Sequence, residues 1–155
     1  MKSTKLSLLV KFLVLGATLT GCGEAFEGRF RGDAYLPESC GITVDPNGYS
    51  LEIRAQVSNE SFNFDLTSLL RKSNNTPDQQ ISSHIGDVSG SSGISNTAFG
   101  NTKETSNGVV VSFSGKISTA RDQIDNFIVR YQTTRSDGSD CQIQVQAKDS
   151  LKLVQ

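Results

Sequence analysis

The side chains that most often carry out chemistry in proteins are few in this sequence. Its 155 residues include one histidine, His84, and three cysteines, Cys22, Cys40 and Cys141. A catalytic histidine needs a positioned nucleophile and an acid that orients it. The serines around His84 lie in a tract of low complexity that lacks a Gly-x-Ser-x-Gly motif. We therefore place His84 at the end of a short helix, where a cation suits the helix dipole, and predict no catalytic residue.

Metal and cofactor sites are not indicated either. A lone histidine and cysteines far apart in the chain do not form a recognisable set of zinc ligands. Asp137 and Asp140 flank Gly138, and Asp45 lies near Asn47, but neither spacing matches a calcium loop. Both pairs are typical of turns. No glycine-rich phosphate loop is present, so we expect no cofactor.

The composition is dominated by uncharged polar residues. The chain has 21 Ser, 12 Thr, 9 Asn and 9 Gln, whereas hydrophobic residues make up 35% and charged residues 20%. This mixture excludes a coiled coil, a multi-pass membrane protein and a basic nucleic-acid-binding protein. The 14 glycines indicate strands and turns, in one domain with a thin core.

The amino terminus differs from the rest of the chain. Lys2 and Lys5 precede an apolar stretch, Leu6–Leu15, which only Ser7 and Lys11 interrupt. This stretch is about ten residues long, well short of the ~20 that cross a bilayer, so it is typical of a secretory signal.

The tetrapeptide that follows, Leu19-Thr20-Gly21-Cys22, resembles the lipobox of bacterial lipoproteins. The resemblance implies cleavage before Cys22 and lipid attachment to that residue, so residues 1–21 are a signal peptide and 22–25 a lipidated tether. Gly23 follows the cysteine where the family's inner-membrane retention signal usually has Asp. The resemblance therefore implies a cell-envelope protein, held by its lipid in the outer membrane rather than the inner one.

Once Cys22 is lipidated, Cys40 and Cys141 are the two remaining thiols. Export takes them to an oxidising compartment, where paired cysteines normally form a bridge. We expect a disulfide that joins an early strand to the last one. The rival interpretations are two buried free thiols or a redox-active pair, which usually needs closer spacing.

Period-two alternation covers much of residues 26–155, the β-domain. It is clear from Phe26 to Leu36, from Tyr49 to Val57 and from Cys141 to Ala147. Residues 124–134 have helical spacing but β-branched and aromatic composition, and we interpret them as a strand. We predict an all-β fold, a single antiparallel barrel or sandwich of about seven or eight strands.

Three segments lead to more specific predictions. Asp45-Pro-Asn-Gly48 is expected to join a strand at Cys40–Val44 to the next strand in a hairpin. Thr76, followed by Pro77 and Gln79, predicts the N-cap of a short helix at about 77–85. Residues 87–107 lack periodicity, and we expect a mobile insertion there, carrying at most one irregular strand.

One outward face carries charges, namely Arg29, Arg31 and Asp33 with Glu52 and Arg54. A solvated face with cross-strand charge pairs explains it better than a partner-binding surface. The tripeptide Arg31-Gly32-Asp33 spells an adhesion motif, but it falls within a strand with Gly32 facing inward, so we attribute it to chance.

These observations favour a non-enzymatic binding or interaction module. The layout of signal, lipobox, strands and one disulfide is similar to that of small lipid-anchored β-barrels, which include lipocalin-like proteins and lysozyme inhibitors. We expect it to bind an envelope protein partner, a cell-wall component or a small apolar ligand. The alternatives are a cell-wall hydrolase and a purely structural assembly subunit.

Overall fold

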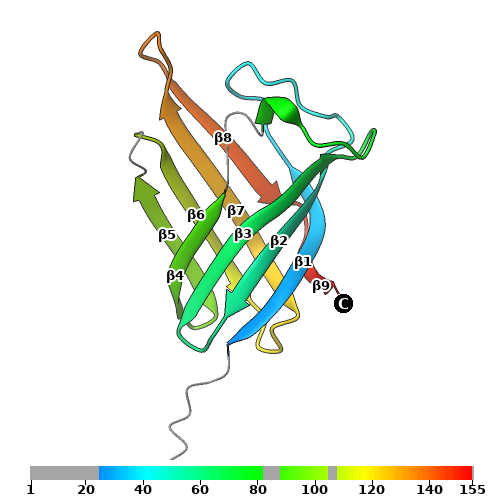
Figure 1. The fold of residues 1–155 in the computed structure, drawn as a ribbon, viewed down its shortest axis with the longest axis vertical. Helices are drawn as coiled ribbons and strands as arrows, with labels where there is room; N and C mark the ends of the chain where they lie inside the picture. Colours follow the sequence, from blue (N-terminus) through cyan, green and yellow to red (C-terminus); the bar gives the residue numbers. More distant parts are fainter. Residues whose placement is uncertain (1–24, 82–87, 105–107, 155) are drawn as a thin grey trace, which may run out of the picture.

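The structure is a computed structural model that describes residues 25–81, 88–104 and 108–154. The described residues form nine strands (Figure 1). In chain order these are β1 (Phe26–Tyr35), β2 (Tyr49–Val57), β3 (Ser61–Arg71), β4 (Ser89–Ser95), β5 (Ala98–Glu104), β6 (Val110–Ile117), β7 (Gln123–Thr134), β8 (Asp140–Ala147) and β9 (Leu151–Val154). Residues 1–21, predicted to be a signal peptide, lie outside the described residues.

The strands form a closed antiparallel barrel in which each strand from β1 to β8 pairs with the next. The barrel has eight positions because β8 and β9 share one: β8 lies between β7 and the end of β1, and β9 lies between β7 and the middle of β1. The all-β prediction is therefore confirmed, as a barrel rather than a sandwich. The strand at 124–134 is confirmed as part of β7.

The two ends of the barrel differ. The connections after β2, β4 and β6 are short, and together with the start of β1 they form what we call the turn end. The connections after β1, β3, β5 and β7 leave the barrel at its other end, which we call the loop end. Their described residues are 36–48, 72–81, 88, 108–109 and 135–139. Figure 1 shows the loop end at the top of the view and the chain entering β1 at the bottom.

Aromatic rings fill the barrel interior toward the turn end. Phe62 and Phe99 stack with ring centroids 3.7 Å apart, and Phe64 meets Phe113 edge to face at 4.9 Å. Gly90 lies against these rings: a Cβ there would stand 2.5 Å from carbons of both Phe64 and Phe113. The rings thus require a residue without a side chain on β4.

The hairpin predicted at Cys40–Val44 is wrong, because residues 36–48 form no strand and β2 pairs with β1 instead. The turn itself is present: the Gly48 N–H donates to the Asp45 carbonyl at 2.9 Å, and Gly48 has φ +81°. β1 and β2 pair at nine positions, and β3 pairs with the other edge of β2. No edge of β2 is left for Cys40–Val44.

The predicted helix begins later than expected. Helical residues start at Gln79, and the N-cap is Asp78 rather than Thr76, because Asp78 Oδ1 accepts the N–H groups of Gln80 at 3.1 Å and Ile81 at 3.3 Å. Pro77 forms a β-bridge with Leu70 instead of the first helical turn. The rest of the predicted helix, with His84, lies outside the described residues.

The expectation of at most one irregular strand at 87–107 is wrong for the residues described there. Ser89–Ser95 and Ala98–Glu104 are β4 and β5, two positions of the barrel wall. β4 lacks hydrophobic alternation because its inward places next to the aromatic rings are held by Gly90 and Ser92. Among the described helical residues, none belongs to a helix long and apolar enough to cross a membrane.

Candidate functional site

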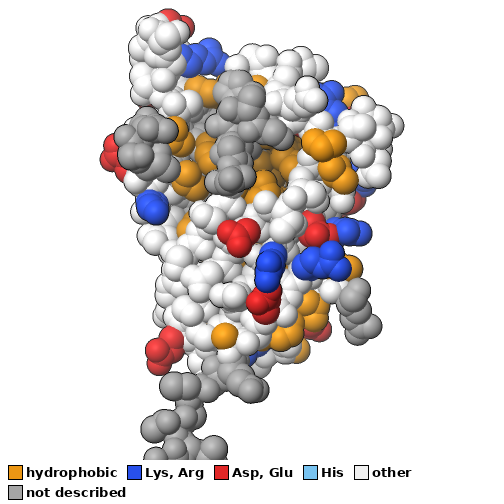
Figure 2. All heavy atoms as spheres, viewed as in Figure 1, with side chains coloured by type: hydrophobic (Ala, Val, Ile, Leu, Met, Phe, Trp, Pro, Cys, Tyr) orange, Lys and Arg blue, Asp and Glu red, His pale blue; other side chains and the backbone are white. Residues whose placement is uncertain are grey.

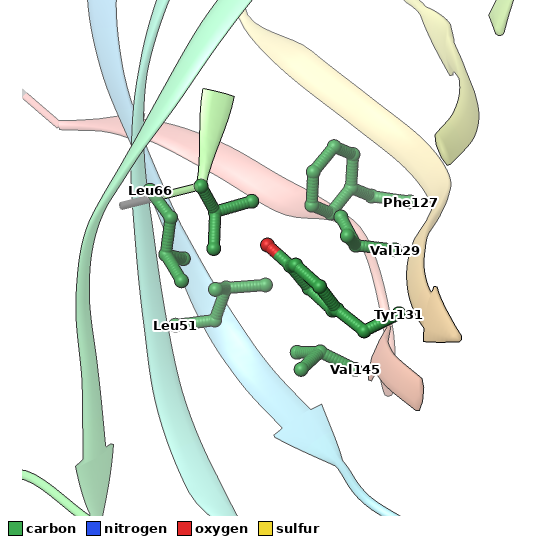
Figure 3. A pocket seen from close by; sticks show the side chains of 7 residues that line it. Leu51, Leu66, Phe127, Val129, Tyr131 and Val145 are labelled. Carbon is green, nitrogen blue, oxygen red and sulfur yellow. The ribbon is translucent and has the colours of Figure 1, made fainter. Parts of the chain in front are cut away.

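A small apolar pocket lies inside the barrel (Figure 3). Its volume is about 10 Å³, room for one water molecule. Six of its lining residues come from strands β2, β3, β7 and β8, and the seventh, Val88, precedes β4. The lining is Leu51, Leu66, Val88, Phe127, Val129, Tyr131 and Val145.

Tyr131 carries the polar atom among these lining side chains. It lies on β7, where Phe127, Val129 and Tyr131 alternate inward, and it pairs with Val111 on β6 and Ile143 on β8. The residue is 4% exposed, and its hydroxyl has no hydrogen-bond partner among the described residues. Figure 3 shows this hydroxyl directed into the pocket, toward the side of Leu51 and Leu66.

Burial raises the pKa of the Tyr131 phenol far above its usual value of 10.0. The hydroxyl therefore stays protonated at any physiological pH and remains able to donate a hydrogen bond. A buried donor without a partner costs about 1–3 kcal/mol. An acceptor delivered into the pocket would recover part of that cost.

A second buried tyrosine, Tyr49 at the start of β2, has a fully bonded hydroxyl. It donates to Asp78 Oδ2 at 2.9 Å and accepts the Asp45 N–H at 2.9 Å. Arg71 Nε contacts the same oxygen of Asp78 at 2.8 Å, and the Ser73 N–H donates to Asp45 Oδ2 at 2.9 Å. This buried network fixes residues 36–48 and 72–81 to the wall formed by β2 and β3.

A disulfide joins the first of these connections to β8. Cys40, which has φ +59°, is bonded to Cys141 at the start of β8, with their Cα atoms 5.4 Å apart. The predicted bridge is thus present, but it starts from an irregular segment and ends on β8, not on the last strand. Ile42 and Leu36 in the same connection are buried against the core. In Figure 2 hydrophobic side chains are visible in a hollow between the loop-end connections.

The outward charged face carries cross-strand ion pairs, as predicted for a solvated face. Glu52 is 7% exposed and accepts from Arg31 Nε at 3.0 Å, while Thr67 Oγ1 donates to its other oxygen at 3.2 Å. Further along, Arg54 pairs with Glu27. No side chain of this face lines the pocket.

The Arg31-Gly32-Asp33 tripeptide lies within β1. A Cβ on Gly32 would meet Leu151 at 2.9 Å, so this residue faces inward, as predicted. Asp33 is bonded to Lys72 Nζ at 2.7 Å. The tripeptide is therefore part of the paired outer wall.

Other residues named from the sequence are not brought together. Asp137 Oδ1 accepts the Ser139 N–H at 2.9 Å within the turn between β7 and β8, as expected of a turn residue. Asp140 is at the start of β8, and Thr134 donates to its carboxylate at 3.4 Å. Within the described ranges, no three His, Cys, Asp or Glu side chains are grouped so as to hold a metal ion. Cys22 and His84 lie outside those ranges.

Tyr131 was not predicted from the sequence as a site residue. The available signal was its place in the inward series of β7, where a residue with a polar tip follows Phe127 and Val129. Whether that tip finds a partner depends on the side chains across the barrel, on β2 and β3, which the pattern along β7 does not specify. No family model matches the chain, and a search of curated proteins finds no match.

Proposed function

We propose that this protein is a lipid-anchored lipoprotein of the bacterial envelope whose barrel binds a small, neutral, largely apolar molecule with one hydrogen-bond acceptor. The observation that carries the proposal is the buried Tyr131 hydroxyl, which points into an apolar pocket and has no partner in the described part of the chain. An apolar cavity with few polar groups is typical of small-molecule sites. An eight-stranded barrel is just wide enough for its side chains or one small ligand.

The chemistry of the lining supports a neutral ligand. Apart from the Tyr131 hydroxyl, every lining side chain is aliphatic or a phenylalanine ring, so a charged group would be buried without an ionic partner. The pocket as it stands has room for only one water molecule, so a ligand must displace part of the lining. Val88 is the lining residue outside the strands, and its carbonyl accepts the Leu66 N–H at 2.7 Å. We expect Val88 to move and the strands to stay.

The binding role is non-enzymatic in this proposal. The pocket supplies one hydroxyl, on Tyr131, whose raised pKa keeps it protonated and makes it a poor nucleophile. A cell-wall hydrolase would need carboxylates or an activated nucleophile around the ligand, and no lining residue provides one.

The membrane part of the proposal rests on the lipobox resemblance and on the position of β1. β1 begins at Phe26, at the turn end, four residues after Cys22. A lipid on Cys22 would thus hold the turn end next to the membrane, and the loop end would face away from it. Gly23 favours the outer membrane.

Lipidation is tested by labelling. Cells that express the full chain and are fed a radiolabelled fatty acid should incorporate the label, and the protein should partition into detergent. Cys22→Ser should abolish both, whereas Cys40→Ser should leave the labelling intact. Unchanged labelling of Cys22→Ser would overturn the anchor.

Ligand binding is tested with cyclohexanone, a small apolar molecule with one acceptor. The full chain with Cys22→Ser, with selectively labelled methyl groups, is titrated and followed by NMR. We expect saturable shifts at Leu51, Leu66 and Val145. Val145→Phe should fill the pocket and abolish the shifts, whereas Val110→Phe, which adds the same bulk on the outer side of β6, should preserve them. Absence of saturable shifts in the parent protein would overturn the proposal.

A further inference from the structure

The barrel wall is not paired throughout between β4 and β5. These two strands pair at Ile94↔Phe99 and Ser95↔Ala98, next to their turn. Beyond these pairs, Ser89–Gly93 is bonded to β3 on one side and Gly100–Glu104 to β6 on the other. Two strand edges therefore face each other without a ladder between them, and we call this region the seam.

The turn between the strands fixes which backbone groups face the seam. Asn96 and Thr97 have φ +49° and +69°, as a two-residue type I′ hairpin turn requires. Such a turn makes Ser95 and Ala98 a hydrogen-bonded pair, and hydrogen-bonded pairs recur at every second position. Continuing that register would pair Ser91 with Thr102, with their backbone groups facing each other.

The side chain of Asn101 stands between those two groups. Its Nδ2 donates to the Ser91 carbonyl at 2.8 Å, and its Oδ1 accepts the Thr102 N–H at 2.8 Å. The carboxamide thus offers one donor to β4 and one acceptor to β5, which is what a peptide group of an intervening strand would offer. The seam is wide enough at this point for an amide to be held between its two edges.

The residues that border the seam leave it open to solvent. Gly100 to Glu104 are all exposed, as are Ser89, Ser91 and Gly93 on β4. The β4 edge carries only serine and glycine side chains there, and so lacks the charges and prolines that commonly protect an exposed strand edge. Five residues on each side span about 16 Å at 3.3 Å per residue.

We propose that the seam binds an extended peptide segment of a partner protein, which adds one strand between β4 and β5 and displaces the Asn101 side chain. The occupant must have both of its edges free, because the seam offers an edge on each side. Each of the nine described strands is already paired along at least one edge. A second folded copy of this barrel therefore does not fit, whereas an isolated extended segment does.

Side-chain alternation adds a preference for the peptide. An inserted strand would direct every second side chain toward the interior, where Phe113 and Phe64 lie next to β4. The other side chains would face solvent beside Ser91 and Thr102. The partner segment should therefore alternate apolar and polar residues over about five positions.

The test uses the acetylated, amidated peptide Lys-Val-Thr-Val-Thr-Val-Lys with a fluorescent label, titrated into the full chain and followed by anisotropy. Two further peptides carry N-methyl groups on one or the other alternate set of amides. We expect the parent peptide to bind and both methylated peptides to bind at least tenfold more weakly, since insertion uses both peptide edges. No binding of the parent peptide, or full binding of either methylated form, would overturn the proposal.

Variants locate the peptide. Asn101→Ala removes the competing amide and should strengthen binding severalfold. Thr102→Pro removes an N–H that faces the seam, not one that bonds to β6, and should weaken binding at least tenfold while far-ultraviolet circular dichroism stays unchanged. Gln142→Ala, on the paired wall of β7 and β8, is the control and should change nothing. If all three variants bound the peptide with equal affinity, the peptide would bind elsewhere, and the proposal would be overturned.

Peptide binding at the seam can be tested independently of ligand binding in the pocket. Tyr131→Phe should leave peptide binding unchanged, because Tyr131 lies on β7 and does not border the seam. If Tyr131→Phe abolished peptide binding, the seam would not be an independent site.

Discussion

Tyr49 and Tyr131 are both buried in the barrel core, yet among the described residues only the hydroxyl of Tyr49 finds a hydrogen-bond partner. Tyr49 is bonded to Asp78 and to the backbone of Asp45, whereas the Tyr131 hydroxyl meets only apolar side chains in the pocket. The two residues have the same side chain and similar burial. Comparing them therefore shows what a hydrogen-bond partner contributes to a buried tyrosine hydroxyl.

Two conservative substitutions should therefore change the free energy of unfolding in opposite directions. Tyr131→Phe should raise the free energy of unfolding by about 1 kcal/mol, because it removes a buried donor without a partner. Tyr49→Phe should lower it by about 1–3 kcal/mol, because it leaves Asp78 and the Asp45 N–H each short of one partner. Urea denaturation at pH 7 measures both values. A loss of stability in Tyr131→Phe as large as that in Tyr49→Phe would show that the Tyr131 hydroxyl is bonded.

The disulfide should supply a large share of the stability. Cys40 and Cys141 are separated by 101 positions, and closing a loop of that length is worth up to about 4–5 kcal/mol in the chain-entropy model. Reduction should lower the melting temperature of the parent protein markedly. The double variant Cys40→Ala/Cys141→Ala should melt at the lower temperature with or without reductant. Alkylation of both thiols in the native, unreduced protein would contradict the bridge.

The Glu52 ion pair should make part of the stability sensitive to acid. Burial raises the pKa of the Glu52 carboxyl, but the hydrogen bonds and charge of Arg31, with Thr67, lower it to a net value below its usual 4.5. Because the folded pKa lies below the unfolded one, the ionised carboxylate stabilises the fold above about pH 4.5. That contribution is lost as the pH falls through the folded pKa.

Glu52→Gln should therefore cost about 1 kcal/mol at pH 7, a modest value because Arg31 is half-exposed. The difference from the parent protein should shrink steadily below pH 4.5. Glu60→Gln, at an exposed position between β2 and β3, is the control and should change stability little at either pH. A Glu52→Gln penalty that stays constant down to pH 3 would contradict this role for the carboxylate.

The barrel strands were predictable where one face is buried and side chains alternate. Phe30 and Ala34 on β1 and Phe62 and Phe64 on β3 face inward as the pattern indicates. β4 and β5 were not predictable in this way, because Gly90 and Ser92 occupy inward places beside aromatic rings contributed by β3 and β6. Small residues there complement rings that lie far away in the sequence.

A turn was predictable from its own residues, but the pairing of the segments beside it was not. Asp45–Gly48 forms its turn, yet a turn does not determine whether Cys40–Val44 finds a strand partner. That depends on β1 and β3, which already occupy both edges of β2. The pocket could not be predicted for the same reason, since six of its seven lining residues come from four strands that are brought together only when the barrel closes.

In the proposed function, the Tyr131 hydroxyl donates a hydrogen bond to an acceptor on an apolar ligand. The most direct measurement compares cyclohexanone with methylenecyclohexane, which has nearly the same shape and no carbonyl oxygen, by NMR titration of the full chain with Cys22→Ser. We predict that the parent protein prefers the ketone by about fivefold or more, the value of a net hydrogen bond of about 1 kcal/mol. Tyr131→Phe should remove that preference. An equal preference for the ketone in both proteins would contradict the account.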